Sequence, residues 1–306
     1  MDAKKVTFHA TRVRLDGADK FIRGFTYVFA SIFALLCVVP FWMIIASSFS
    51  TETAIRRSGF TLWPSSFSTY AYDLIFRSPD QLIGSYIVTI TMTVIGTSVG
   101  LSIISMTGYC LQRRDFAFRN GISFYIYFTS LFSAGLVPFY YLMVKIFGLK
   151  DSYWAVLLPL LMSPWLIILM KNYIKAIPHE ITESGKIDGA GDFRIFWSLI
   201  LPSITPALAT IGLFLALGYW NEWYYSSLFL GSQVKYRPLQ YQLYNIINKV
   251  ASLKNSLAGA NVVLNDLPSE TLKMATATLA TGPIILLYPF VQKYFVAGLT
   301  VGAVKG

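Results

Sequence analysis

Charged residues are scarce in this chain of 306 residues: Asp, Glu, Lys and Arg together make up 13% of it, whereas hydrophobic residues make up 55%. A soluble domain carries about 25% charged residues, so this composition argues against an ordinary soluble protein. Uncharged stretches recur along the sequence, and they reach the length of about 20 residues that crosses a bilayer. The sequence therefore predicts a multi-pass membrane protein.

Residues that form disulfides or ligate metals are also few, with two cysteines and two histidines in the whole chain. Cys37 lies inside the first apolar run and Cys110 at the end of the second, which predicts two buried thiols instead of a disulfide. His9 and His179 do not complete a metal-binding cluster with them, because such a cluster needs more ligands close together. We therefore expect no metal site.

The signatures of an enzyme are missing as well. The chain contains no G-x-x-x-x-G-K-[ST] phosphate loop and no Ser/His/Asp arrangement, so we expect neither catalytic residues nor an ATP site on this polypeptide. It also lacks a basic patch with interleaved aromatic residues, which argues against a nucleic-acid partner. The net charge of +10 instead favours contact with anionic membrane lipids.

Six uncharged runs predict an all-α membrane protein with six transmembrane helices, because backbone polar groups in lipid must be hydrogen-bonded within their own segment. Basic residues are more numerous on the side that holds both termini, so the positive-inside rule places the tails 1–23 and 299–306 in the cytoplasm. Between them we predict one six-helix domain, 24–298, with an outer segment at 231–273. Its predicted spans are about 24–50, 82–112, 120–145, 152–172, 203–230 and 274–296.

A polar stretch, PHEITESGKIDGAGDFRIFWSLILP, separates the fourth and fifth apolar runs at residues 178–202. Pro178 suits the first turn of a helix, and Glu180 and Glu183 place negative charge near its N-terminal end. The glycines of IDGAG then predict a tight turn before a second helix that enters the membrane. Taken alone, this pattern fits an ordinary amphipathic loop as well as a docking element.

The spacing within this stretch resembles a known motif. The pattern E-S-G-x-x-x-G, which begins at Glu183 and is followed after nine residues by L-x-L-P ending at Pro202, is similar to the EAA motif of membrane subunits of ABC importers. Gly185 stands where a second alanine is usual, and Leu199 replaces the usual isoleucine. The segment VPFYYLMVKIFGLKDSYWAVLLP resembles the maltose-type second permease subunit. The C-terminal LPSETLKMATATLATGPIILLYPFVQKYFVAGLTVGAVKG resembles permeases of an oligosaccharide subgroup in Gram-positive bacteria.

This resemblance, which runs from about residue 21 to residue 306, implies a type I ABC importer permease fold. In that family the EAA motif forms a coupling helix that sits in a groove of a cytoplasmic ATPase and carries the closure of the ATPase to the membrane helices. The residues that the resemblance assigns to coupling are Glu180, Glu183, Ser184, Gly185, Lys186, Asp188, Gly189, Ala190, Leu201 and Pro202.

The resemblance also implies the partners and the solute. We expect a second, different permease subunit, two copies of an ATPase subunit that hold ATP and Mg²⁺, and an extracytoplasmic solute-binding protein at the bacterial plasma membrane. This chain should itself bind no cofactor. The expected solute is a carbohydrate, specifically an oligosaccharide, and the alternatives are a non-sugar solute or a scaffold or signalling protein that transports nothing. The segment 231–273 is expected either to contact the binding protein or to lie on the membrane surface.

The fifth predicted span ends in LGYWNEWYYSSLF, where Glu222 is the one charge in an otherwise apolar run. An ionisable residue inside a membrane is a functional candidate by default, and WNE at this place is similar to a recurring feature of carbohydrate permeases. The aromatic side chains could stack on sugar rings, pack against the partner permease, or anchor the helix at the membrane surface. The candidates for a substrate pathway are Tyr219, Trp220, Asn221, Glu222, Trp223 and Tyr224.

Small residues recur at regular spacing in the second predicted span. Small side chains at four-residue intervals let two helices approach closely. This pattern predicts a packing surface, either within the chain or toward the second permease. The residues concerned are Gly96, Gly100 and Gly108, with Ser98, Ser102 and Ser105 between them.

Overall fold

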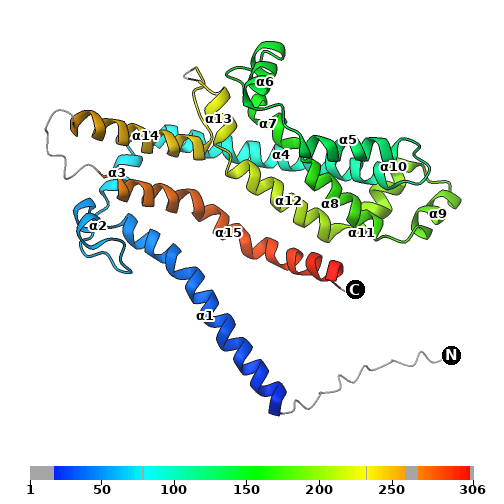
Figure 1. The fold of residues 1–306 in the computed structure, drawn as a ribbon, viewed down its shortest axis with the longest axis horizontal. Coiled ribbons are helices and arrows are strands. Elements are labelled where there is room, and N and C mark those ends of the chain that lie inside the picture. Colours follow the sequence, from blue (N-terminus) through cyan, green and yellow to red (C-terminus); the bar gives the residue numbers. More distant parts are fainter. Residues whose placement is uncertain (1–16, 78, 232, 259–267, 304–306) are drawn as a thin grey trace.

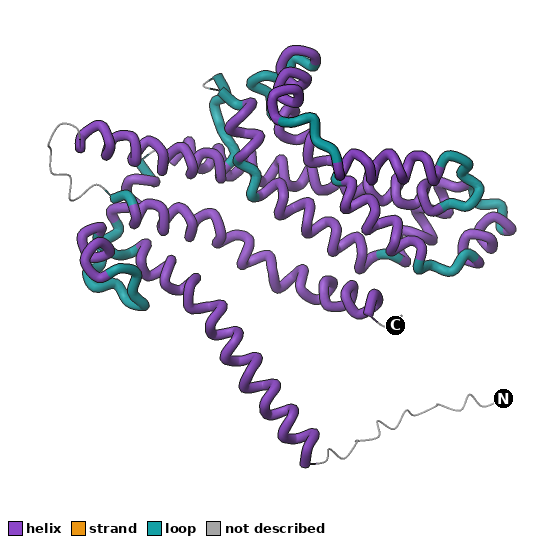
Figure 2. The backbone as a smooth tube through the Cα atoms, viewed as in Figure 1, coloured by secondary structure: helices purple, strands orange, loops and turns teal. Residues whose placement is uncertain are grey.

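The computed structural model describes residues 17–303 apart from Ser78, Ser232 and 259–267. The two predicted tails and the predicted outer segment therefore lie partly outside the described residues. Within these residues the chain is helical, and strand-type pairing is limited to one isolated bridge (Figure 2). The predicted all-α class is confirmed for this part of the chain.

In chain order (Figure 1) the elements are α1 (Gly17–Ser48), α2 (Glu52–Ser58), α3 (Tyr70–Ile75), α4 (Pro79–Gln112), α5 (Arg119–Leu131), α6 (Leu136–Tyr141), the π-helical turn η1 (Leu142–Ile146), α7 (Trp154–Leu161), α8 (Pro164–Lys175), α9 (Glu180–Ile187), α10 (Asp192–Ile195), the π-helical turn η2 (Phe196–Ile200), α11 (Leu201–Ser203), α12 (Thr205–Trp220), α13 (Tyr224–Phe229), α14 (Leu239–Ala258) and α15 (Glu270–Ala303).

The centre of the fold is α4, against which α5, α7, α8, α12 and α14 all pack (Figure 1). Buried glycines let these helices come close. A Cβ atom at Gly96 would lie 2.3 Å from the ring of Tyr219 in α12, and one at Gly100 would lie 3.0 Å from the carbonyl oxygen of Leu161 in α7. Gly108 is buried in the same way against α8. The three glycines of the predicted surface therefore pack within the chain, as does Ser105, whereas Ser98 and Ser102 are exposed.

Three helical stretches are long and apolar enough to cross a membrane on their own: Asp19–Ser48, Pro79–Gln112 and Trp154–Lys175. They correspond to the first, second and fourth predicted spans. The fifth corresponds to Thr205–Phe229, which the preceding helical segment meets at 85°. The sixth predicted span lies within α15, a single helix from Glu270 to Ala303.

The third predicted span, 120–145, is not one continuous helix but a bent pair of helical segments. The chain breaks after α5, and the helical segment Leu136–Ile146 leaves at an angle of 113°. Phe132 is already extended, and Gly135 has a φ of 89°, a left-handed value that glycine adopts without strain. The apolar composition of this segment did not reveal the break. Composition indicates that a segment lies in nonpolar surroundings, but it does not indicate the direction of the backbone.

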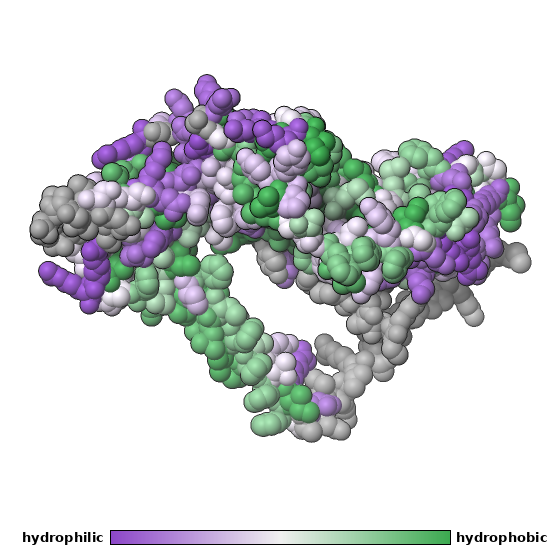
Figure 3. Space-filling model, turned by 45° about the horizontal axis from the view of Figure 1, so that its top comes forward, coloured by the Kyte–Doolittle hydropathy of each residue, from purple (hydrophilic) through white to green (hydrophobic). Residues whose placement is uncertain are grey.

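Helix α1 diverges from the bundle, and its main contact within the chain is with α15 (Figure 1). Its apolar side chains are exposed over most of its length, for example Phe29 at 62% and Leu36 at 63%. Figure 3 shows a nearly continuous hydrophobic surface along it. Soluble proteins rarely expose so large an apolar surface, so α1 requires lipid or another protein around it.

Both cysteines are free, as predicted, but the prediction that they are buried is wrong. Cys37 lies on the exposed length of α1, and Cys110 lies on an exposed face of α4 near its end. An apolar sequence context indicates a nonpolar neighbour, and it does not distinguish a protein interior from lipid.

The predicted outer segment, 231–273, contains the helix α14. Its side chains Leu239, Leu243 and Val250 are buried in a hydrophobic cluster with residues of α4 and α15. The backbone N–H of Leu239 donates to Thr89 Oγ1 in α4 (2.7 Å). One face of α14 is therefore committed to its own chain, which leaves the opposite face for a membrane surface or a partner.

At the other end of the molecule, the segment from α10 to α11 turns through 85° into α12. Its side chains Ile195, Phe196 and Ile200 are buried in a cluster formed with α4, α8 and α12. Ile204, at the bend, is buried too. This packed segment holds the polar helix α9 at the ends of α4 and α8 (Figure 1).

Candidate functional site

Helix α9 is a short polar helix between α8 and α10 at one end of the molecule (Figure 1). Gly189 follows it with a φ of 75°, the left-handed conformation that ends many helices. The N–H of Ala190 donates to the carbonyl oxygen of Gly185 (2.9 Å) and closes the last turn. Gly191 then leads into α10. The short helix, glycine turn and second helix predicted from the sequence are therefore present.

The two faces of α9 have different surroundings. Gly185 is buried, and a Cβ atom there would lie 3.0 Å from Leu199 Cδ1 and 3.1 Å from Ile195 Cγ1. Glycine in place of the usual alanine thus lets α9 lie close to the segment that enters α12. Ala190 and Leu201 are half-buried in the same region. The remaining predicted coupling residues are exposed: Glu180, Glu183, Ser184, Lys186, Asp188, Gly189 and Pro202.

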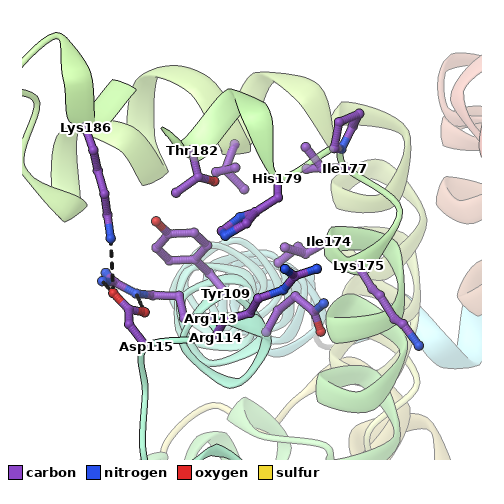
Figure 4. Close-up of a pocket in the computed structure, with 13 residues that line it drawn as sticks. Tyr109, Arg113, Arg114, Asp115, Ile174, Lys175, Ile177, His179, Thr182 and Lys186 are labelled. Carbon is purple, nitrogen blue, oxygen red and sulfur yellow. Dashed lines mark hydrogen bonds and ion pairs between the residues drawn. The ribbon is translucent and has the colours of Figure 1, made fainter. Parts of the chain in front are cut away.

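Ion pairs tie α9 and α10 to the end of α4, and the pairs that involve Asp115 are drawn in Figure 4. Arg113 Nε donates to Asp115 Oδ1 (2.8 Å), and its terminal nitrogen pairs with Asp192 at 2.7 Å. Lys186 Nζ pairs with Asp115 from α9 at 3.1 Å. Hydrogen bonding to Arg113, and then to Lys186, holds the pKa of Asp115 well below its usual range. The carboxylate therefore stays ionised at neutral pH, and this network joins the polar helix to the central helix of the bundle.

Sequence reasoning did not identify this network. Arg113 and Asp115 stand immediately after the second predicted span, where Arg113 counted only toward the positive-inside rule and Asp115 was given no role. Lys186, which pairs with Asp115, lies 71 residues away from it in the sequence. A cluster of opposite charges at a span end is a usable signal, but its partner cannot be read from local spacing.

Glu222 serves as a helix cap. Its side chain is buried, with 7% of the residue exposed. The carboxylate accepts hydrogen bonds from the backbone N–H groups of Tyr225 and Ser226 and from the Ser226 hydroxyl. These are the unpaired donors at the start of α13, where a negative charge is favoured. The Glu222 carboxylate, which made this span a functional candidate, therefore binds the first turn of α13.

The other five substrate-pathway candidates divide into two groups. Tyr219 and Trp220 are buried, and they donate to the carbonyl oxygens of Leu157 (2.9 Å) and Ala280 (3.0 Å) respectively. Their polar atoms are therefore occupied by the protein itself. The group that remains exposed for a ligand consists of Asn221, Trp223 and Tyr224.

Replacing Glu222 with glutamine is expected to lower the stability of the protein by about 1–3 kcal/mol, because a charge-assisted cap on buried N–H groups is weakened. Thermal unfolding of the purified protein in detergent measures this loss. Glu270→Gln is the matched control, since the Glu270 carboxylate is partly exposed and lies outside the coupling and substrate-pathway residues. Unchanged unfolding together with lost uptake would contradict the cap and return Glu222 to the substrate pathway.

Comparison with known proteins gives a consistent result. Residues 100–301 match the family described as "Binding-protein-dependent transport system inner membrane component". The chain is 41% identical to the polygalacturonan/rhamnogalacturonan transport system permease protein YtcP of Bacillus subtilis (strain 168), over 92% of this chain and 96% of that protein. It is 28% identical to the arabinooligosaccharides transport system permease protein AraQ of Halalkalibacterium halodurans, over 92% and 95%.

A solved structure agrees with these relatives. The crystal structure of a bacterial ABC transporter involved in the import of the acidic polysaccharide alginate contains a chain with the same fold, at a TM-score of 0.75 and 31% sequence identity. The match covers 92% of this chain and 99% of that one. The protein therefore belongs to the family of binding-protein-dependent inner membrane components, the permease subunits of ABC importers.

Proposed function

We propose that this chain forms half of the translocation pathway of an ATP-driven importer for an oligosaccharide. The observation that carries the proposal is the set of solutes in the names of its relatives. They are polygalacturonan or rhamnogalacturonan, arabino-oligosaccharides and alginate, all of them carbohydrates. The exposed aromatic side chains of Trp223 and Tyr224 support it, because such rings can stack on sugars.

In this proposal the protein spans the membrane six times, with α15 as the last span and both tails in the cytoplasm. Helix α9 and the C-terminal end of α15 lie on the same side of the molecule, away from α2 and α14 (Figure 1). This arrangement supports a topology in which α9 faces the cytoplasm and α14 the outside. The excess of basic residues on the α9 side supports the same orientation.

Helix α9 is the proposed coupling helix. Closure of the ATPase subunits pushes on its exposed face, and two connections carry the movement inward. The Lys186–Asp115–Arg113 ion pairs transmit it to α4. The contact of Gly185 with Ile195 and Leu199 transmits it to the segment that bends into α12.

The proposed partners follow from what this chain leaves open. ATP and Mg²⁺ belong to two copies of a cytoplasmic ATPase subunit, and this chain catalyses no covalent step. A second, different permease would cover the exposed apolar surface of α1 together with lipid. An extracytoplasmic binding protein would deliver the sugar near α14. Asn221, Trp223 and Tyr224 are the proposed contacts of the sugar within this subunit.

The test is to purify the tagged chain gently from its native membrane, to identify its partners by mass spectrometry, and to assay uptake of labelled oligosaccharides in proteoliposomes. We expect a second permease, an ATPase with a phosphate loop, and uptake that requires ATP. A complete complex that imports only non-sugar solutes would refute the carbohydrate assignment. A chain that never associates with an ATPase would refute the importer and favour a scaffold.

Replacing Gly189 with proline is expected to uncouple ATP hydrolysis from uptake, because proline holds φ at about −65° whereas this turn has a φ of 75°. Gly189→Ala should have a smaller effect, since a left-handed alanine costs about 1–2 kcal/mol. Gly191→Ala is the control: φ is −67° there, and a Cβ atom meets nothing within 4 Å at either glycine. ATPase activity and uptake are measured together, and normal uptake in Gly189→Pro would remove the coupling role from this turn.

A further inference from the structure

A cavity of about 310 Å³ lies between the ends of α4 and α8 and the start of α9 (Figure 4). It opens on the side of α9 that faces the bundle, and Lys186 is the one coupling candidate that also lines it. Its volume is at the lower end of the range of about 300–1,000 Å³ for small-molecule sites. The cavity therefore suits a small ligand.

The lining of this cavity is strongly basic. Four basic side chains line it, Arg113, Arg114, Lys175 and Lys186, whereas Asp115 is the carboxylate among them. Arg113 and Lys186 are already paired with Asp115. Arg114 and Lys175 form no ion pair with any residue that the structure describes, and two positive charges are left without compensation there.

The orientation of the arginines adds to this picture. Figure 4 shows Arg113 turned toward Asp115, whereas Arg114 extends the other way, below His179 and toward Ile174. Arg114 belongs to the end of α4, Lys175 to the last turn of α8, and His179 precedes α9. An anion beside Arg114 and His179 would contact the end of α4 and the start of α9, and Lys175 of α8, whose ammonium extends away from the cavity in Figure 4, would add its charge from the rim.

The floor of the cavity holds a polar group without a partner. Tyr109 is 7% exposed, and its buried hydroxyl has no hydrogen-bond partner within the described part of the chain. Figure 4 shows this hydroxyl directed toward α9. Leaving a buried hydroxyl unpaired costs about 1–3 kcal/mol, so a ligand with acceptor oxygens would gain by contacting it.

We propose that this cavity binds the phosphate group of a small anion. Arginine presents a planar set of donors that matches phosphate, and lysine adds a point charge. Two sources supply this chemistry at a membrane surface: the head group of an anionic phospholipid, and a soluble phosphate monoester. In either case the bound phosphate braces the start of α9 against α4 and α8.

The experiment uses the complex as it is purified from the native membrane, reconstituted in nanodiscs of phosphatidylcholine. Binding of labelled glycerol 3-phosphate is measured by equilibrium dialysis, and retention of phosphatidylglycerol by native mass spectrometry. We expect Arg114→Gln combined with Lys175→Gln to weaken binding about 10-fold, which corresponds to about 1.4 kcal/mol. Arg57→Gln, which removes an exposed charge on α2 at the far end of the molecule, is the control and should leave binding unchanged.

Tyr109→Phe gives an independent test, because the thermal stability and the affinity for the anion should change in opposite directions. Removing the unpaired hydroxyl should raise the thermal stability of the empty protein and lower its affinity for the anion, which a purely structural tyrosine would not do. Retention of phosphatidylglycerol alone supports the lipid source, and binding of glycerol 3-phosphate supports the soluble source. The proposal is overturned if neither anion binds, or if the variants bind as well as the parent protein. Uptake is not the readout, so this result and the test of transport can fail independently.

Discussion

Replacing Glu52 with alanine is expected to destabilise the protein by about 3–5 kcal/mol, the range for breaking a buried charged interaction. Glu52 is 5% exposed. Its Oε2 accepts hydrogen bonds from the backbone N–H groups of Ser269 (3.0 Å), Glu270 (3.0 Å) and Thr271 (3.1 Å). Its Oε1 pairs with Arg56 at 3.2 Å. Alanine would leave the first turn of α15 without acceptors in a buried setting.

Thermal unfolding in detergent and the yield of assembled complex measure this effect. Glu52→Gln should lie between the parent and the alanine variant, because an amide oxygen accepts hydrogen bonds but carries no charge for the helix start. Glu270→Gln is the matched control: its carboxylate stands in the same helix turn and pairs with Lys273 alone among the residues that the structure describes, in a partly exposed setting. Equal stability of the parent and Glu52→Ala would show that α15 does not depend on this cap.

The Glu52 cap explains how the chain is held together at the end of the molecule that carries α2 and α14. Glu52 follows the first predicted span, and its carboxylate accepts a hydrogen bond from the backbone N–H of Ser269, 217 residues later in the chain. Helix α2 and the start of α15 are thereby held together, and α1 lies beside them (Figure 1). Helix α1 ends near this cap and α15 begins at it, and the two helices diverge from there. The cap therefore fixes the point from which these two helices extend along one side of the subunit.

The features that the sequence predicted well rest on local signals. Proline, acidic residues and glycines within a dozen positions predicted α9 and its turn, because capping and left-handed glycine act on neighbouring residues. Glycine spacing predicted the packing surface of α4 for a similar reason.

The features that the sequence missed depend on contacts between distant segments. The break at Gly135 required knowledge of backbone direction, and an unbroken apolar run concealed it. Glu222 attracted attention as a charge in an apolar run, yet its carboxylate caps the helix that follows. Neither Asp115 nor Glu52 could be assigned a role, because each has partners more than 70 residues away.

Replacing Gly96 with valine is expected to expel the Tyr219 ring from its place against α4 and to cost about 3 kcal/mol, through overpacking and the loss of a buried hydrogen bond. A Cβ atom at this position would lie 2.3 Å from the ring, which leaves no room even for alanine. The Tyr219 hydroxyl would then lose the carbonyl oxygen of Leu157, to which it donates at 2.9 Å. Gly218→Ala is the control in α12, because a Cβ atom there meets nothing within 4 Å.

Gly96→Val should also affect transport, because Tyr219 lies just before the exposed residues Asn221, Trp223 and Tyr224. A displaced ring moves the end of α12, so uptake should fall together with thermal stability. Tyr219→Leu combined with Gly96→Ala restores space, and a double-mutant cycle then isolates the contact. Recovered stability with recovered uptake means that Tyr219 only positions the end of α12. Recovered stability without uptake means that the tyrosine contributes to the pathway itself, and additive losses would show that the two residues are not in contact.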